Sequence, residues 1–195
     1  MIRTLAATVL AVLAFAAPAQ AQVGAGSRSV YIDQVGSANR ASVRQAQGLA
    51  RAVISQAGDA HHADIAQSGA GAANAEVRQA GAGQVALVAQ GGAGANAALV
   101  QQEGIGNRAE VAQTATLAMA NVAAIRQLGS GNSAALTQDG GDNEAVLEQL
   151  GDDNRMTAAQ SGQGNRLQWS QQGTNLANLG IVQTGGSQMQ ITQTR

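Results

Sequence analysis

Apolar and polar side chains alternate along this chain in short segments, and glutamine marks a nearly fixed repeat interval. Most glutamines of the series are 11 residues apart, and the longest step, from Gln113 to Gln127, is 14 residues. An aliphatic residue usually stands two positions before the glutamine, and alanine usually stands four before. The exceptions four before are Val30, Met156, Leu167, Leu179 and Met189. The glutamines of this series are Gln34, Gln45, Gln56, Gln67, Gln79, Gln90, Gln102, Gln113, Gln127, Gln138, Gln149, Gln160, Gln171, Gln183 and Gln193.

The even spacing of these rows predicts a strand in each repeat. Side chains of a strand alternate between its two faces, so residues two, four and six positions before a glutamine share its face. Asparagine dominates the position six before. Charged residues fall on odd positions instead: Arg44 and Glu148 lie one before a glutamine, and Asp64 lies three before. We therefore expect an inward face of glutamine, aliphatic residues, alanine and asparagine, and a charged outer face.

Glycine occupies the connection between one glutamine and the next asparagine, which is also where the repeat length varies. Glycine adopts the backbone conformations that tight turns need, and turns tolerate insertions. Each repeat is thus predicted to be one strand and one turn. The turn glycines of the best-formed repeats are Gly36, Gly104, Gly129, Gly140, Gly151 and Gly162.

Two repeats form one turn of a β-solenoid in this interpretation, so the fold class is all-β and alternate glutamines stack in the same sheet. A buried amide needs hydrogen-bond partners, and amides stacked at strand spacing can each donate to the next. We expect such structural ladders at Gln34, Gln45, Gln102, Gln113, Gln127, Gln138, Gln149, Gln160, Asn39, Asn107, Asn132, Asn143, Asn154 and Asn165.

Two other structures are compatible with parts of the pattern. An 11-residue period is also typical of a right-handed helical coiled coil, and alanine favours helix. However, the apolar residues are two positions apart, and glycine in most repeats costs a helix about 1 kcal/mol each. A glutamine-rich disordered segment is the other alternative, which the strict register opposes as the final state.

The composition of the chain limits the classes of function that we expect. The formal net charge is −1, there is no cysteine, and aromatic residues make up 2% of the chain. We expect neither disulfides nor a nucleic-acid site, and too few large side chains for an ordinary globular core. The adjacent His61 and His62 should point in opposite directions, which opposes a metal site. We expect no cofactor and no enzymatic activity, because no acid–base pair or nucleophile with a nearby histidine occurs.

The N-terminus has the pattern of a secretory signal peptide. Arg3 precedes a short apolar run, and Ala19 and Ala21 form a small-residue cleavage site. The predicted organisation is a signal peptide over residues 1–21, a short segment over 22–33 that enters the first strand, and a solenoid over 34–195. We expect no cap at either end of the solenoid. Open strand edges template the addition of another chain, so the mature protein should be secreted and should polymerise end to end.

The repeat Gln-x-Gly-x-x-Asn-x-Ala-x-x-x-Gln resembles the curlin repeat of bacterial curli fibres. It occurs in full at 34–45 (QVGSANRASVRQ), 102–113 (QEGIGNRAEVAQ), 127–138 (QLGSGNSAALTQ) and 138–149 (QDGGDNEAVLEQ). The resemblance implies an extracellular, cell-surface amyloid fibre with roles in biofilm matrix and adhesion to host or abiotic surfaces. Its implied partners are further copies, other curlin subunits, and the outer-membrane secretion and assembly machinery.

The C-terminal sequence VQTGGSQMQITQTR is similar to the end of the minor curlin, which nucleates fibres at the cell surface. The residues that carry this likeness are Ser187, Gln188, Met189, Thr192, Gln193 and Arg195. A nucleator-like subunit is therefore favoured, with a major fibre subunit as the alternative. A monomeric β-solenoid that binds a ligand or a surface is a further alternative, distinguished by its solubility.

Overall fold

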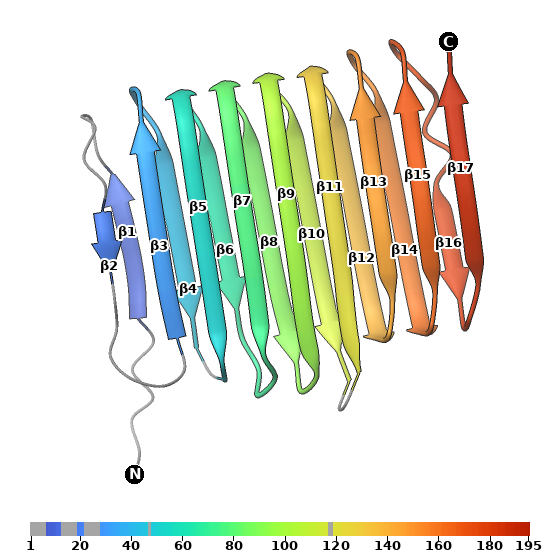
Figure 1. Ribbon diagram of the computed structural model, residues 1–195, viewed down its shortest axis with the longest axis horizontal. Coiled ribbons are helices and arrows are strands. Elements are labelled where there is room, and N and C mark those ends of the chain that lie inside the picture. Colours follow the sequence, from blue (N-terminus) through green and yellow to red (C-terminus); the bar gives the residue numbers. More distant parts are fainter. Residues whose placement is uncertain (1–6, 13–18, 22–27, 47, 117–118) are drawn as a thin grey trace.

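The computed structural model describes residues 7–12, 19–21, 28–46, 48–116 and 119–195 of the chain. Within these residues every regular element is a β-strand (Figure 1). None of the described residues forms a helix long and apolar enough to cross a membrane. The strands are β1 (Ala7–Val12), β2 (Ala19–Ala21), β3 (Arg28–Val35), β4 (Arg40–Gln45), β5 (Ala50–Asp59), β6 (His62–Gln67), β7 (Ala73–Ala82), β8 (Val85–Gly92), β9 (Ala95–Ile105), β10 (Arg108–Ala115), β11 (Ala120–Ser130), β12 (Ser133–Gly141), β13 (Glu144–Leu150), β14 (Arg155–Gln163), β15 (Arg166–Gln172), β16 (Ile181–Thr184) and β17 (Gln188–Thr194).

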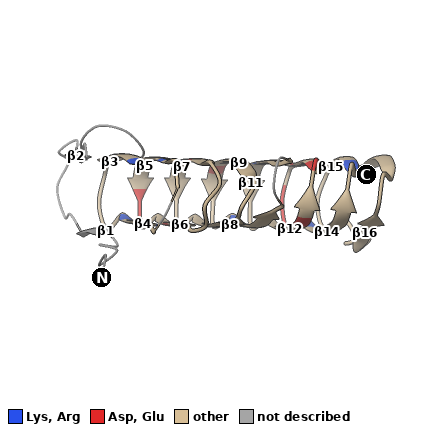
Figure 2. Cartoon of the chain, turned by 90° about the horizontal axis from the view of Figure 1, so that it is seen from below, with Lys and Arg blue, Asp and Glu red and all other residues tan. Residues whose placement is uncertain are grey.

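The strands form two sheets that face each other in a flat, two-layered solenoid (Figures 1 and 2). The nine-stranded sheet holds β2 and the odd-numbered strands from β3 to β17, and the eight-stranded sheet holds β1 and the even-numbered strands from β4 to β16. Neighbours from β3 to β17 pair in parallel, whereas β1 pairs antiparallel with β4 and β2 pairs antiparallel with β3. The predicted all-β solenoid with two repeats per turn is confirmed.

The parallel pairing keeps the repeats in register from one end to the other. Gln127 lies between Gln102 and Gln149 in the nine-stranded sheet, and Gln113 lies between Gln90 and Gln138 in the other. The 14-residue step between Gln113 and Gln127 therefore leaves the stack continuous. The extra residues fall between β10 and β11, where a turn can absorb them.

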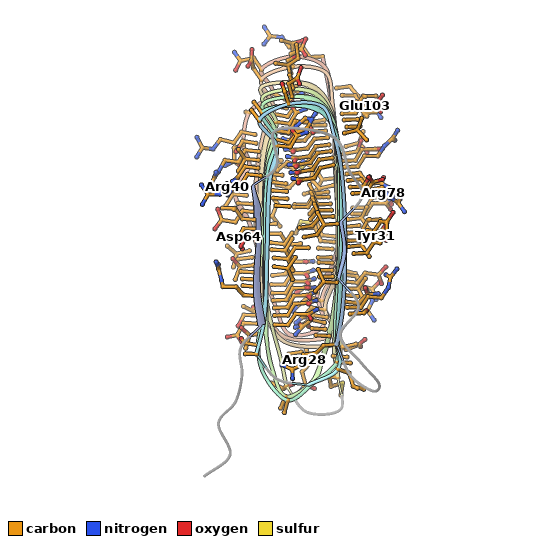
Figure 3. All side chains as sticks on the ribbon, turned by 90° about the vertical axis from the view of Figure 1, so that its left-hand side faces the viewer. Arg28, Tyr31, Arg40, Asp64, Arg78 and Glu103 are labelled. Atoms are coloured by element: carbon orange, nitrogen blue, oxygen red, sulfur yellow. The ribbon has the colours of Figure 1, made fainter. Side chains whose placement is uncertain are left out.

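The core is a thin layer between the two sheets, and the outer faces carry the charges. The rows two and four before the glutamines are buried through the middle of the stack, from Ala41 and Val43 to Leu167 and Trp169. Figure 3 shows Arg40 and Asp64 pointing outward from one sheet, and Tyr31, Arg78 and Glu103 from the other. Alanine brings the sheets close together, and the aliphatic row fills the remaining space.

The expected burial of the inward row is not reached at the C-terminal end. Leu179 is 51% exposed and lies outside any strand, and Met189 is 40% exposed although it lies in β17. Gly180 has a φ of 61° and ends the extended conformation before β16 begins. Met189 is in the last strand of its sheet, so no further strand covers it.

Candidate functional site

The inward glutamines form two hydrogen-bonded ladders that run through the stack. In the nine-stranded sheet Nε2 of each glutamine, from Gln34 to Gln171, donates to Oε1 of the next, at distances between 2.5 and 3.1 Å. In the eight-stranded sheet the ladder runs from Gln45 to Gln183 at 2.8 to 2.9 Å. Both ladders have one direction, from the N-terminal rung to the C-terminal rung.

Each ladder amide also connects the two sheets. Nε2 of Gln127 donates to Oε1 of Gln149 at 2.8 Å and, with its second hydrogen, to the carbonyl oxygen of Arg108 at 2.9 Å. Arg108 belongs to the opposite sheet. The glutamine row therefore satisfies its own buried amides, extends the stack and fixes the spacing of the sheets. Gln34, Gln45, Gln102, Gln113, Gln127, Gln138, Gln149 and Gln160 all occupy these positions.

The asparagines make a different contact from the expected amide-to-amide ladder. Nδ2 of Asn132 donates to the carbonyl oxygen of Gly151 at 2.6 Å, and its Oδ1 accepts the N–H of Asn154 at 3.0 Å. Asn39, Asn107 and Asn154 bond backbone atoms of the next rung in the same way. These four asparagines lie beside the turns, so their amides link successive turns through backbone atoms.

Direct amide-to-amide bonds between asparagines occur, among the described residues, only at the other edge of the solenoid. There Nδ2 of Asn143 donates to Oδ1 of Asn121 at 3.2 Å, and Nδ2 of Asn165 donates to Oδ1 of Asn143 at 2.8 Å. Asn143 also donates to the carbonyl oxygen of Gly162 at 3.0 Å. All the predicted asparagine positions are thus buried in turn clamps.

The turn glycines allow successive backbones to approach closely. Gly104 has a φ of 114°, and a Cβ built on it would overlap the carbonyl oxygen of Gly129 one rung later. Gly36, Gly129, Gly140 and Gly151 meet their neighbours in the same way. Gly162 has a φ of 86° but more space, with Gly185 N at 3.4 Å from the position of a Cβ.

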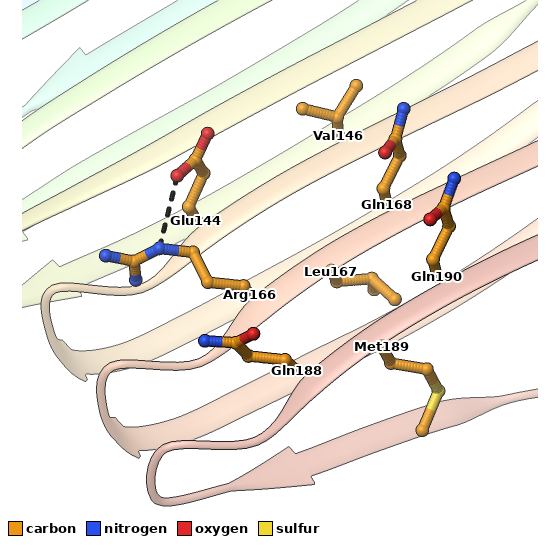
Figure 4. Close-up of a pocket in the computed structure, with 8 residues that line it drawn as sticks. All are labelled: Glu144, Val146, Arg166, Leu167, Gln168, Gln188, Met189 and Gln190. Carbon is orange, nitrogen blue, oxygen red and sulfur yellow. Dashed lines mark ion pairs between the residues drawn. The ribbon is translucent and has the colours of Figure 1, made fainter.

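Outward charges pair mainly between neighbouring strands. Arg126 contacts Glu148 at 2.8 Å. Arg166 contacts Asp142 at 2.9 Å and Glu144 at 3.3 Å, and the pair with Glu144 is drawn in Figure 4. Glu144 and Arg166 border a shallow outer pocket with Val146, Gln168 and Gln190. These pairs are largely exposed, and such pairs typically contribute ~0–1 kcal/mol. The described residues hold no group of three or more His, Cys, Asp or Glu side chains placed to bind a metal ion.

The residues at the C-terminus lie on the last strand or beside it. Gln188, Met189, Thr192 and Gln193 belong to β17, an edge strand, and the N–H of Ser187 donates to Oδ1 of Asn165 at 3.2 Å. Oε1 of Gln193 accepts hydrogen bonds from Gln171 and Trp169, both at 2.9 Å. The N–H of Arg195 donates to Gln172. These residues end the ladder of the nine-stranded sheet.

The other end of that ladder has an acceptor without a donor. Gln34 is 6% exposed, and its Oε1 finds no hydrogen-bond partner among the described residues. A buried polar atom without a partner costs about 1–3 kcal/mol, so its presence calls for an explanation. In the interior of the stack the equivalent oxygen accepts the amide of the preceding glutamine.

Residues 129–162, from the end of β11 to β14, match a family model described as the curlin associated repeat. This part of the chain therefore carries a curlin associated repeat. The matched stretch contains the complete repeat from Gln138 to Gln149, and the same side-chain contacts continue on both sides of it. No curated protein and no solved structure matches the chain.

One member of the asparagine row was absent from the sequence interpretation. Gln84 stands six positions before Gln90 and is buried, with its Nε2 bonded to the carbonyl oxygens of Ala80 and Gly104. The spacing alone marks this position. The residue type does not suggest the asparagine row, because the repeated glutamines of the chain belong to the ladder row six positions later.

Proposed function

We propose that the mature chain is a secreted structural subunit of a curli-type extracellular amyloid fibre. The observation that carries this proposal is the pair of in-register parallel sheets, in which one hydrogen-bonding pattern repeats from rung to rung. The edge strands β16 and β17 have a free side, and such edges add further strands of the same kind. The curlin repeat supports the same function.

The contact between copies follows from the direction of the ladder. Nε2 donates toward the C-terminal rung throughout, so Gln193 ends the ladder as a donor and Gln34 begins it as an acceptor. When β17 of one copy stacks on β3 of the next, Gln193 donates to the unpartnered Oε1 of Gln34. Met189 and Ile191 then lie against Val30 and Ile32. The interface is head to tail, which does not close and so forms a fibre.

Export is part of the proposal. Residues 1–21 act as a signal peptide that is cleaved after Ala21, which removes β1 and β2 from the edges of β4 and β3. Residues 22–33 then lead into the solenoid, and the structure starts β3 at Arg28 within this segment. The subunit would pass the outer membrane through the curli secretion machinery and function in biofilm matrix and adhesion, at the cell surface.

Within that role we favour a nucleator-like subunit over a major fibre subunit. The likeness of the C-terminus to the minor curlin supports it, and residues 188–194 form the exposed growth edge β17. A chain without residues 183–195 should retain the earlier rungs but should fail to seed other curlin subunits or remain on the cell surface. Unchanged seeding and retention would instead favour the major subunit.

The test of the central proposal is assembly of residues 22–195 diluted from denaturant. We expect thioflavin-T fluorescence to rise after a lag that preformed fibres abolish, with fibre reflections near ~4.8 Å and ~10 Å. A persistent soluble β-rich monomer would contradict polymerisation. It would favour the alternative in which the solenoid binds a ligand or a surface with its flat outer face.

A further inference from the structure

His61 replaces asparagine in the row of turn clamps and is 1% exposed. Its main-chain N–H donates to Oδ1 of Asn39 in the preceding rung at 3.0 Å. Its ring Nε2 lies 3.2 Å from the carbonyl oxygen of Ala57, and its ring Nδ1 lies 3.4 Å from the main-chain nitrogen of Gln84 in the next rung. The ring Nδ1 thus accepts from the next rung as an asparagine Oδ1 does, and the Nε2 contact lies within the same turn, like that of Asn39 Nδ2 with the carbonyl oxygen of Val35.

These two contacts fix the protonation state of the ring. A carbonyl oxygen accepts only, so Nε2 must carry a hydrogen toward Ala57. A main-chain N–H donates only, so Nδ1 must present its lone pair to Gln84. Both bonds exist together only in the neutral imidazole with its hydrogen on Nε2. A second proton would point at the N–H of Gln84 and leave two buried donors facing each other.

The charged groups around the ring are exposed and act on its protonation in opposite directions. Asp59 lies in the same turn, and its pKa is held below the ordinary value chiefly by the hydroxyl of Ser37 and next by the N–H of Ser37. The charge of His61 acts in the same direction, so Asp59 attracts a protonated ring, but from an exposed position where solvent screens it. Arg40 lies in register with His62 on the outer face, where the positive charge of Arg40 opposes a charge on His61.

We propose that His61 is a proton-responsive joint between the rung of β5 and β6 and the rung of β7 and β8. In neutral solution the ring links the two turns, and in mildly acidic solution protonation breaks the bond from Gln84 and weakens the link, leaving the main-chain bonds from Gly83 to Asp59 and from His62 to Gln84. A histidine exposed in the unfolded chain gains a proton around pH 6.5, so mildly acidic solution favours the state in which the ring is released from these contacts. The inference concerns the fold of one chain and holds whether or not the chain forms fibres.

The sequence offers a clean test, because it contains two histidines and no cysteine. Unfolding in guanidinium is followed by fluorescence of the single tryptophan, Trp169, between pH 8 and pH 5.5. We expect the unfolding equilibrium constant of the native chain to rise about tenfold over this range. His61→Asn should reduce the change to less than about twofold, because asparagine makes both clamp bonds at any of these pH values.

His62→Asn is the matched control and should keep the full tenfold change. An unchanged pH dependence in His61→Asn, its loss in His62→Asn, or its absence in the native chain would overturn the proposal. A second measurement does not depend on any variant. Nitrogen chemical shifts of labelled histidine at pH 8 should show the hydrogen on Nε2 of His61, and a neutral ring with the hydrogen on Nδ1 would equally refute the joint.

Discussion

The N-terminal and C-terminal rungs have the same glutamine ladders but different turn clamps. Between Asn39 and Asn96 the clamp row holds Ala50, His61, Ala73 and Gln84, whereas from Asn96 to Asn165 every member is asparagine. The glutamine row, by contrast, is unbroken from β3 to β17. The clamp row thus contains several residue types in the N-terminal region, whereas the ladder row is glutamine in both regions.

The difference follows from what each amide connects. A ladder glutamine bonds the next rung and the opposite sheet, so its loss leaves buried groups unsatisfied in two directions. A clamp asparagine bonds one turn to the next, and other side chains can do part of this, as His61 does. Substitutions in the turn glycines and in the glutamine ladder, which both regions share, should therefore change stability equally in the two regions. Substitutions in the clamp row should change stability differently in the N-terminal and C-terminal regions.

The largest effect is expected at the stacked turn glycines, equally in both regions. Gly58 and Gly140 have φ of 119° and 120°, and a Cβ on either would overlap a carbonyl oxygen of the next rung. Gly58→Ala and Gly140→Ala should each cost at least ~3 kcal/mol in the free energy of unfolding, because backbone must move. Gly106→Ala is the control, since its φ of 65° strains alanine but nothing lies within 4 Å of the Cβ. A cost at Gly106 as large as at Gly140 would refute the overlap as the cause.

The next effect is expected in the ladders. Gln56→Ala and Gln149→Ala should each destabilise the chain by about 3 kcal/mol and slow assembly, because each removes both amide bonds and leaves a neighbour unsatisfied. Glu148→Ala removes only an exposed ion pair with Arg126 and should cost less than ~1 kcal/mol. Denaturant unfolding and thioflavin-T growth rates measure both. Equal kinetics for Gln149→Ala and Glu148→Ala would contradict the inward ladder.

A smaller effect, of opposite sign in the two regions, is expected from exchanging clamp residues. Oε1 of Gln84 is buried and has no partner among the residues that the structure describes. Gln84→Asn should place Oδ1 where it accepts the N–H of Asn107 and should stabilise the chain by about 1 kcal/mol. Asn132→Gln should lose the bond to Asn154 and destabilise by a similar amount. Destabilisation in both variants would show that the two regions use different clamps.

The smallest effect is expected at Asp59, which accepts two bonds from Ser37 at an exposed turn. These bonds lower the pKa of its carboxyl group, so their contribution is present above the ordinary value of about 3.9 and is lost as the pH falls below it. Asp59→Asn should remove this contribution, so it should lower the thermal stability slightly at pH 7 and leave it nearly unchanged at pH 2. Thermal unfolding between pH 2 and pH 7 checks it, and a change at pH 2 as large as the change at pH 7 would contradict the argument.

Much of the fold was predictable because two independent periods coincide. The alternation of Val43 and Arg44 assigns each residue to a face, and the 11-residue interval assigns it to a rung. Together they place Gln127 between Gln102 and Gln149 without further information, as the register confirms. The pairing of Glu144 with Arg166 follows from the same arithmetic and is confirmed.

The contacts of the clamp row were less predictable, since they depend on side-chain length and turn geometry. Asn132 and Gln149 carry the same amide, yet one bonds backbone and the other bonds amide. The exposure of Leu179 was missed for another reason: periodicity describes an infinite stack, whereas the end of a real one lacks the next rung. The unpartnered oxygen of Gln34 has the same origin and becomes visible only in the structure.

The most direct test of the account is the structure of fibres of residues 22–195 by cryo-electron microscopy. We predict a two-layered solenoid with the glutamines inward and with β17 of each copy stacked in parallel on β3 of the next, so that Gln193 bonds Gln34 and the ladder is continuous. Outward-facing glutamines, or copies joined end to end in opposite directions, would contradict the ladder as the element that both builds the fold and extends it.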